Sequence, residues 1–169
     1  MNIRQYKSID LNQIARLFYE TVHAVNIKDY TEQQVNVWAT GNINVQEWDT
    51  SFLNHLTYVA TEKDVIIGFG DIDETGYLNR LFVHKDFQGR GVATAICNRL
   101  ENEIGTECIT VHASITAKPF FEKRGYHTIK SQEVERLGVS LKNYIMVKNL
   151  QNPFKRTIRK TGNIQETTL

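Results

Sequence analysis

The sequence predicts an α+β fold, a mixed α/β sandwich with a mainly antiparallel central sheet, and three patterns lead to this class. Strand-like apolar runs follow one another from Thr57 to His84 with no helical segment between them. Helical spacing of apolar residues precedes these runs and follows them. Strands and helices alternate only from Tyr77 to Arg124. We therefore expect helices on the faces of a mixed sheet, not a fully parallel one.

The first part of the chain predicts one strand and two helices. Ile3–Tyr6 is a short strand, and Asp10 is the expected N-cap of a helix with one apolar face. A second helix is expected after Thr31–Gln34, where a capping box precedes Val35. The apolar face of the first helix consists of Leu11, Ile14, Leu17, Phe18 and Val22.

The middle of the chain predicts a hairpin and one further strand. Thr57–Thr61 and Val65–Asp73 pair around Glu62–Asp64, and Glu74–Gly76 turns the chain into the Tyr77–His84 strand. After these come a helix starting near Val92, a strand at Cys108–Ala113, a short helix at Ala117–Arg124, and strands near Tyr126–Glu135 and Asn143–Leu150.

Composition predicts one compact domain over residues 1–150 and a polar, basic tail over residues 151–169. The chain has 169 residues, of which 41% are hydrophobic, enough to bury a core around a cleft. The tail is expected to be solvated, with contact to cofactor phosphates or to RNA as the alternative. A formal net charge of +1 argues against a nucleic-acid partner.

Other partners and locations follow from what the sequence lacks. No apolar run approaches the ~20 residues of a membrane span, and residues 1–5 lack a signal-peptide core, so we expect a cytoplasmic protein with no membrane partner. The five histidines are scattered, so no metal is expected. Cys97 and Cys108 are expected to be small buried hydrophobes. A homodimer through the last strands is left open.

The stretch Gln88–Ala93 (QGRGVA) predicts a phosphate-binding corner between a strand and a helix. The first turn of a helix leaves backbone N–H groups without partners at its positive end. Such a helix start binds phosphate or diphosphate groups well. Gly89 and Gly91 allow the backbone to approach a ligand closely. A plain tight turn before a helix is the alternative.

This corner, read as Gln88-x-x-Gly91-x-Ala93, resembles the acetyl-coenzyme A motif of the GNAT superfamily of N-acetyltransferases. A second segment, Ala113–Tyr126, is similar to the strand, short helix and "(Y/F)EKxGF" ending that follow in this family. The resemblance covers most of Met1 to about Leu150. The opening from Ile3 to Asp10 and the later segment from Gly138 to Lys148 are similar to a bacterial subgroup of uncharacterised members.

The resemblance implies a V-splayed sheet and an acetyl-CoA-dependent N-acetyltransferase acting on a small-molecule or peptide amine, by direct attack in a ternary complex. A non-catalytic acetyl-CoA or CoA sensor is the alternative. The splayed strand would pair with the acetyl oxygen and the pantetheine arm. The cofactor-binding residues expected on this basis are Leu81, Phe82, Val83, Gln88, Gly89, Arg90, Gly91, Val92, Ala93, Thr94, Ser114 and Phe121.

Two aspartates are the candidates for the general base. A lysine-like amine has a pKa of about 10.4 and must lose a proton before attack. If the turn centres on Thr75, Asp73 lies opposite Tyr77 and Asp71 opposite Asn79. Period-two alternation would then place both carboxylates on the face of the splayed strand, near the thioester. Base catalysis by Asp71 or Asp73 through a water is the favoured hypothesis, and solvated turn aspartates are the alternative.

Phe121 departs from the family pattern. Many members carry a tyrosine there, and its hydroxyl can protonate the departing thiolate, which a phenylalanine cannot do. Water or the hydroxyl of Ser114, Tyr126 or Tyr144 would replace it, or the thiolate leaves unaided.

The acceptor itself cannot be read from the sequence. Its pocket is expected near residues 26–38, 40–52 and 136–143. Arg136 is either a partner for a substrate carboxylate or an ordinary surface arginine. Four residues would line this pocket or belong to the ordinary core: Tyr30, Val37, Trp38 and Trp48.

Overall fold

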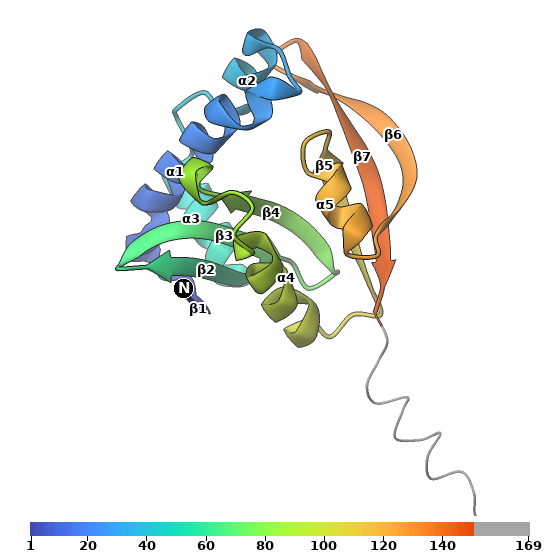
Figure 1. Cartoon of the computed structure of the whole chain (residues 1–169). Coiled ribbons are helices and arrows are strands. Elements are labelled where there is room, and N and C mark those ends of the chain that lie inside the picture. The colour runs from blue at the N-terminus through green and yellow to red at the C-terminus, as the bar shows by residue number, and fades with distance from the viewer. Residues whose placement is uncertain (151–169) are drawn as a thin grey trace, which may run out of the picture.

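A computed structural model describes residues 1–150 as a seven-stranded sheet with helices on both faces (Figure 1). The strand order is β1-β2-β3-β4-β5-β7-β6, and only the pair β4–β5 is parallel. The mixed, mainly antiparallel sheet expected from the sequence is thereby confirmed. The strands are β1 (Asn2–Gln5), β2 (Leu56–Glu62), β3 (Val65–Ile72), β4 (Tyr77–Val83), β5 (Cys108–Ser114), β6 (His127–Arg136) and β7 (Val139–Asn149).

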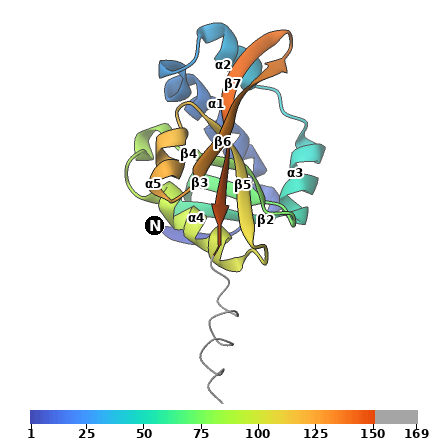
Figure 2. The ribbon, with the colours of Figure 1, turned by 90° about the vertical axis from the view of Figure 1, so that its right-hand side faces the viewer.

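The sheet separates the hydrophobic core into two clusters, and helices cover the cluster on each face. One cluster contains Phe52 and Phe69 and lies under the first three helices. The other contains Ile96 and Phe121 and lies under the last two helices. Figure 2 shows α3 and α5 on opposite sides of the molecule. The helices are α1 (Leu11–Ala24), α2 (Glu32–Trp38), α3 (Val45–Asn54), α4 (Val92–Glu103) and α5 (Lys118–Lys123).

The two N-terminal helices form largely as predicted. All five apolar residues expected on the inner face of α1 are buried. The capping box of α2 is confirmed, because the Gln34 N–H donates to Thr31 Oγ1 over 3.2 Å and the Thr31 N–H donates to Gln34 Oε1 over 2.9 Å. Asp10 is not the side-chain cap of α1. A 3₁₀ turn precedes the helix, and the Asp10 carboxylate instead accepts hydrogen bonds from Lys7 N and from Arg4.

Two segments differ from the prediction. Helix α3 (Val45–Asn54) lies where the sequence predicts no helix or strand. Its N-cap is Asn44, whose side chain accepts a hydrogen bond from Glu47 N over 3.1 Å. The loop expected at residues 136–143 is instead a tight hairpin. Leu137 and Gly138 have positive φ angles, so two residues suffice to join β6 to β7, and Arg136 pairs with Val139.

The sheet splits between β4 and β5, as the family resemblance implied. Only two residue pairs join these strands, Tyr77 with Thr110 and Leu78 with Val111. Beyond them β5 continues to pair with β7, whereas β4 continues to pair with β3. The two halves of the sheet diverge and leave an open V (Figure 1).

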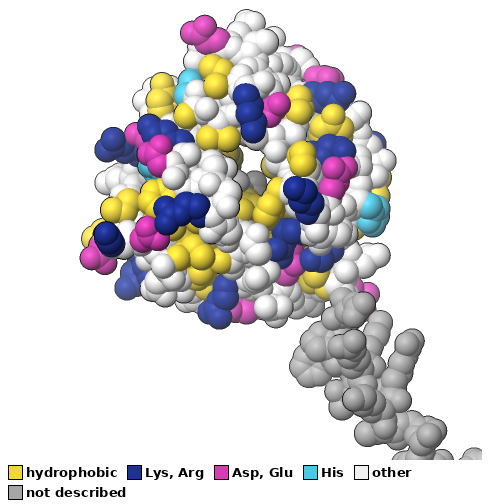
Figure 3. Space-filling model, viewed as in Figure 1, with side chains coloured by type: hydrophobic (Ala, Val, Ile, Leu, Met, Phe, Trp, Pro, Cys, Tyr) yellow, Lys and Arg dark blue, Asp and Glu magenta, His cyan; other side chains and the backbone are white. Residues whose placement is uncertain are grey.

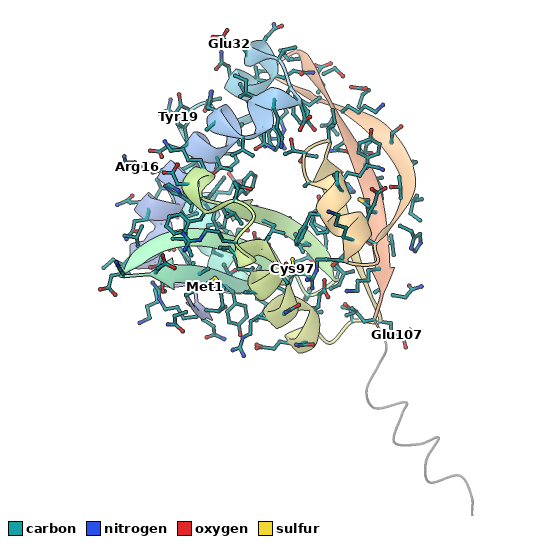
Figure 4. The ribbon with its side chains drawn as sticks, viewed as in Figure 1. Met1, Arg16, Tyr19, Glu32, Cys97 and Glu107 are labelled. Atoms are coloured by element: carbon teal, nitrogen blue, oxygen red, sulfur yellow. The ribbon has the colours of Figure 1, made fainter. Side chains whose placement is uncertain are left out.

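The cysteines differ from one another in environment. Cys97 lies on α4, packs toward the sheet and is fully buried (Figure 4), and burial raises the pKa of its thiol to about 12. Cys108 was expected to be buried but is exposed, because it stands at the start of β5.

Within residues 1–150 no helix is long and apolar enough to cross a membrane. The predicted tail, residues 151–169, lies outside the described residues.

The α1–α2 segment bridges the open V. The Tyr30 hydroxyl donates to the Lys142 carbonyl oxygen over 2.6 Å and accepts from the Ile115 N–H over 2.9 Å. Nearby, Gln34 Nε2 donates to the Ser140 carbonyl oxygen over 2.8 Å. Because Lys142 and Ser140 belong to β7 and Ile115 follows β5, these bonds tie the far half of the sheet to the helices of the near half.

Replacing Tyr30 by phenylalanine should weaken this bridge. The Tyr30 side chain is 6% exposed, so the variant leaves a carbonyl oxygen and an N–H without partners in a largely buried place. We expect a loss of about 1–3 kcal/mol in the free energy of unfolding, measured by urea denaturation. Tyr19→Phe is the matched control, since Tyr19 is 40% exposed on the outer surface of α1 (Figure 4). Equal stabilities of the two variants would contradict the role of the bridge.

Candidate active site

A cavity of about 1170 Å³ occupies the split in the sheet. Its mouth is the hollow near the centre of the face in Figure 3. One end is lined by the loop before α4 and by Phe120 and Phe121 of α5. The other end is lined by Glu47 and Trp48 of α3. The cavity therefore runs from one face of the sheet to the other, past β4 and β5.

The loop before α4 has the geometry of an anion-binding helix start. Gly89 and Gly91 have φ angles of +72° and +78°, which side chains rarely adopt. A Cβ atom at either glycine would meet nothing within 4 Å, so the space above both is open. Gly91 is the N-cap of α4, and the following N–H groups, from Val92 onward, lie at the positive end of this helix. Gln88 Nε2 donates to the Val83 carbonyl oxygen over 2.6 Å and holds the loop against β4.

The edge of β4 that faces β5 is without a strand partner beyond Leu78 among the described residues. Backbone N–H and C=O groups on such an edge can pair with an extended ligand, as in strand addition. Leu81, Phe82 and Val83 lie along this part of β4 and line the cavity. The open edge thus leads directly from the α4 loop into the split.

Comparison with known proteins identifies this arrangement. The acetyltransferase (GNAT) domain model matches residues 26–148. The chain belongs to the GNAT acetyltransferase family. It is an acetyl-CoA-dependent N-acetyltransferase, an enzyme class that transfers an acetyl group from acetyl-CoA to an amine, as the resemblance in the sequence implied.

Similar proteins agree with this assignment. The uncharacterized N-acetyltransferase YafP of Escherichia coli is 35% identical over 149 residues, which are 86% of this chain and 94% of that protein. A crystal structure of a GCN5-related N-acetyltransferase from Rhodopseudomonas palustris is 31% identical, with a TM-score of 0.84 over 88% of this chain and 95% of that one. PaiA N-acetyltransferase from Thermoplasma acidophilum, in complex with coenzyme A, shares the fold at 15% identity, with a TM-score of 0.71 over 88% and 98% of the two chains.

In this GNAT enzyme, the residues expected to bind the cofactor lie together around the cavity, with one exception. Arg90 does not line it, because its guanidinium lies over the Phe87 ring and pairs with Glu62 over 3.4 Å. The cavity-lining members of the expected set are Leu81, Phe82, Val83, Gln88, Gly89, Gly91, Val92, Ala93, Thr94, Ser114 and Phe121.

Phe121 forms an apolar part of the cavity wall. Its ring is 2% exposed and packs against Phe120 and Tyr126. Of the three hydroxyl groups suggested to replace the missing tyrosine, only that of Ser114 belongs to a residue that lines the cavity. The Tyr126 hydroxyl instead donates to Glu101, and burial raises the pKa of Tyr126.

The register predicted for Asp71 is wrong. Asp71 pairs with Arg80 and not with Asn79, because a bulge at Asn79 shifts the β3–β4 pairing by one residue. The Asp71 side chain lies on the α3 side of the sheet, and the bulge brings Arg80 to the same side. There Asp71 is fully buried, and its Oδ2 atom is 2.7 Å from His55 Nδ1 and 2.9 Å from Arg80 Nη1. Asp71 does not line the cavity.

Asp73 stabilises the β3–β4 turn. Its Oδ1 atom accepts hydrogen bonds from Thr75 N, from Thr75 Oγ1 and from Tyr77 N. Burial acts to raise the pKa of Asp73, but these bonds outweigh it and lower that pKa below its ordinary value. A carboxylate held in this way is a weaker base, and Asp73 also does not line the cavity.

Sequence reasoning missed several polar residues of the cavity wall. Glu47, Arg80, His112 and Glu135 line the cavity, together with the expected Tyr30, Trp38 and Trp48, whereas Val37 does not. The alternative that these aromatic residues belong to the hydrophobic core also holds in part, because Tyr30 is buried and both tryptophans pack against the core. One signal for Arg80 was present in the sequence: it is a lone charge inside the apolar run Tyr77–Val83.

No group of three or more His, Cys, Asp or Glu side chains within residues 1–150 is arranged to hold a metal ion.

Replacing Arg80 by leucine should strongly destabilise the enzyme. The variant removes the arginine partner of the fully buried Asp71 carboxylate and leaves it the hydrogen bond with His55 Nδ1. We expect a loss of about 3–5 kcal/mol in the free energy of unfolding, measured by urea denaturation. Arg16→Leu, which removes an 81% exposed partner of Glu20, should change it by less than about 1 kcal/mol. A loss below 1 kcal/mol for Arg80→Leu would mean that His55 alone compensates Asp71.

Proposed function

We propose that acetyl-CoA binds along the open edge of β4 and that a primary amine of a small molecule or peptide, entering from the α3 side, attacks the thioester directly in a ternary complex. The observation that carries this proposal is the continuous cavity through the split sheet, whose lining extends to both faces, so that two substrates can reach one place from opposite sides. Holding both reactants there makes the encounter effectively unimolecular.

In this proposal the diphosphate of the cofactor rests on the amides of the α4 loop. Gln88, Gly89 and residues 91–94 surround it, and the open space over both glycines supports the assignment. The pantetheine arm extends along residues 81–83 as an added strand. Arg90 also stays a predicted cofactor ligand. Its guanidinium pairs with Glu62 and would have to leave that carboxylate to reach the cofactor. The coenzyme A held by the Thermoplasma acidophilum relative supports the choice of cofactor.

Of the hydroxyl groups considered from the sequence as proton donors to the leaving thiolate, that of Ser114 lies in the cavity wall. Ser114 Oγ accepts a hydrogen bond from Ala117 N over 3.0 Å, which leaves its own proton available to donate. Phe121 then contributes only an apolar surface beside the sulfur. A thiol with a pKa near 8.5 is also a tolerable leaving group without assistance.

His112 is our preferred general base. It follows Val111, the last β5 residue that pairs with β4, so it stands where the split begins. Its ring lies at the cavity wall and contacts Tyr77 edge-on. Partial burial, together with the charge of Lys130, lowers the pKa of His112 below its ordinary value. The ring is therefore neutral at pH 7 and able to accept a proton.

Asp71 and Asp73 remain the earlier candidates for this role. Both carboxylates already accept hydrogen bonds from protein groups, which favours structural roles for them.

Homodimer formation and a cytoplasmic location also stay predictions.

The cofactor proposal predicts that Gly91→Ala weakens coenzyme A binding at least tenfold. The added Cβ is strained at a φ of +78° and occupies the space of the diphosphate. Gly105→Ala is the control, because Gly105 also has open space around it but lies beyond the far end of α4. Isothermal titration calorimetry measures both. Unchanged affinity for Gly91→Ala, or no binding by the unaltered protein, would overturn the proposed cofactor site.

The base proposal predicts a change in the pH–rate profile. The rate of the unaltered enzyme should fall on its acid side below pH 6.5, as His112 becomes protonated. His112→Gln should lose this limb and about 10²–10⁴-fold in kcat/KM at pH 7. Asp71→Asn and Asp73→Asn should keep the limb. Its disappearance in either aspartate variant, with its retention in His112→Gln, would return the role to that aspartate.

A further inference from the structure

We infer that the acceptor of this enzyme carries a carboxylate as well as its amine, and that the free edge of the Arg80 guanidinium binds this carboxylate. The inference rests on the proposed function in one respect, which is that the acceptor enters the cavity from the α3 side.

The Arg80 guanidinium is held rigidly at the cavity wall. Its central carbon lies 4.7 Å from the centre of the Trp48 ring and 4.8 Å from that of Phe52. Its Nη1 atom donates to Asp71 Oδ2 over 2.9 Å and to Ser51 Oγ over 3.2 Å. The two rings cover part of the guanidinium, and the two hydrogen bonds use both hydrogens of Nη1.

The remaining donors of Arg80 form the edge that carboxylates recognise. Arginine has five N–H donors, and within residues 1–150 those on Nε and Nη2 donate to no protein group. These two nitrogens lie side by side and match the two oxygens of a carboxylate in a bidentate pair. The side chain is 21% exposed and lines the cavity, so this edge is the part of Arg80 that a ligand can reach.

Charges of both signs line the cavity, which suits a zwitterionic acceptor. Asp71 lies behind Arg80, and its Oδ2 atom is also 2.7 Å from His55 Nδ1, so Asp71 has a hydrogen-bond partner besides Arg80. Glu47 and Glu135 line the same cavity and attract an ammonium group. An amino acid or a similar amino carboxylate presents both charges.

Arg136 also lines the cavity but fits the role less well. It is exposed, and among the described residues no hydrogen bond or ion pair fixes its guanidinium. A fixed donor edge binds a carboxylate at a lower cost in side-chain entropy than a mobile one.

Tryptophan fluorescence gives a direct test that does not require turnover. The sequence has two tryptophans, Trp38 and Trp48, and both line the cavity. The protein, with and without saturating coenzyme A, is titrated with ω-amino acids from glycine to 6-aminohexanoate, with the amide of each, and with putrescine. At least one amino acid should saturate the signal at a concentration at least tenfold below that of its amide and of putrescine.

Substitutions assign the preference to Arg80. Arg80→Lys keeps a cation beside Asp71 but lacks the two-donor edge, so the preference for the carboxylate should fall to less than threefold. Arg99→Lys is the control, because Arg99 also lies over an aromatic ring, that of Tyr58, and pairs with Glu103, but is outside the cavity. It should keep the full preference.

Three results would overturn the inference: equal saturation by acids and amides in the unaltered protein, no saturable signal with any of them, or a preference lost in Arg136→Lys but retained in Arg80→Lys. The first two do not depend on the folding of a variant. Calorimetry with coenzyme A separates the two proposals. Failure to bind it overturns the proposed cofactor site, whereas normal binding without a carboxylate preference overturns this inference alone.

Discussion

The short parallel pairing of β4 with β5 is the constraint on which the rest of the site depends. Two residue pairs hold the strands together, and beyond them each strand pairs only with its outer neighbour. Backbone groups along the split edge of β4 therefore lack a strand partner, which a folded protein seldom leaves unsatisfied away from water. A cleft that water or an extended ligand can fill is the natural use of such an edge.

An open V also needs support on both sides, and the chain supplies it from distant segments. The two hydrophobic clusters hold the helices on each face, while the Tyr30 hydroxyl joins α1 and α2 to β7 and to the end of β5. This bridge crosses between the halves of the sheet, so it fixes the width of the cavity at the end away from the β4–β5 pairing.

The bulge at Asn79 has a comparable effect on the polar residues. By shifting the register of β3 and β4, it places Arg80 beside Asp71 on the α3 side, while Leu81 and Val83 remain with the core on the α4 side. A cation paired with a buried carboxylate and covered by Trp48 and Phe52 is thereby fixed at the cavity wall. The two faces of β4 thus serve different purposes.

The sequence by itself determined most of the elements and the glycine-rich loop before α4, because both depend on local chemistry. Periodic apolar residues define α1, the Thr31 side chain caps α2, and the glycines before α4 adopt positive φ angles that other residues avoid. The tertiary structure alone decided the part of the cavity that faces α3. A single bulge reverses which face a strand residue occupies, so the partners of Asp71 could not be read from alternation. Arg80, His112 and Glu47 come from separate elements, and only the packing of α3 against the split sheet brings them to one cavity.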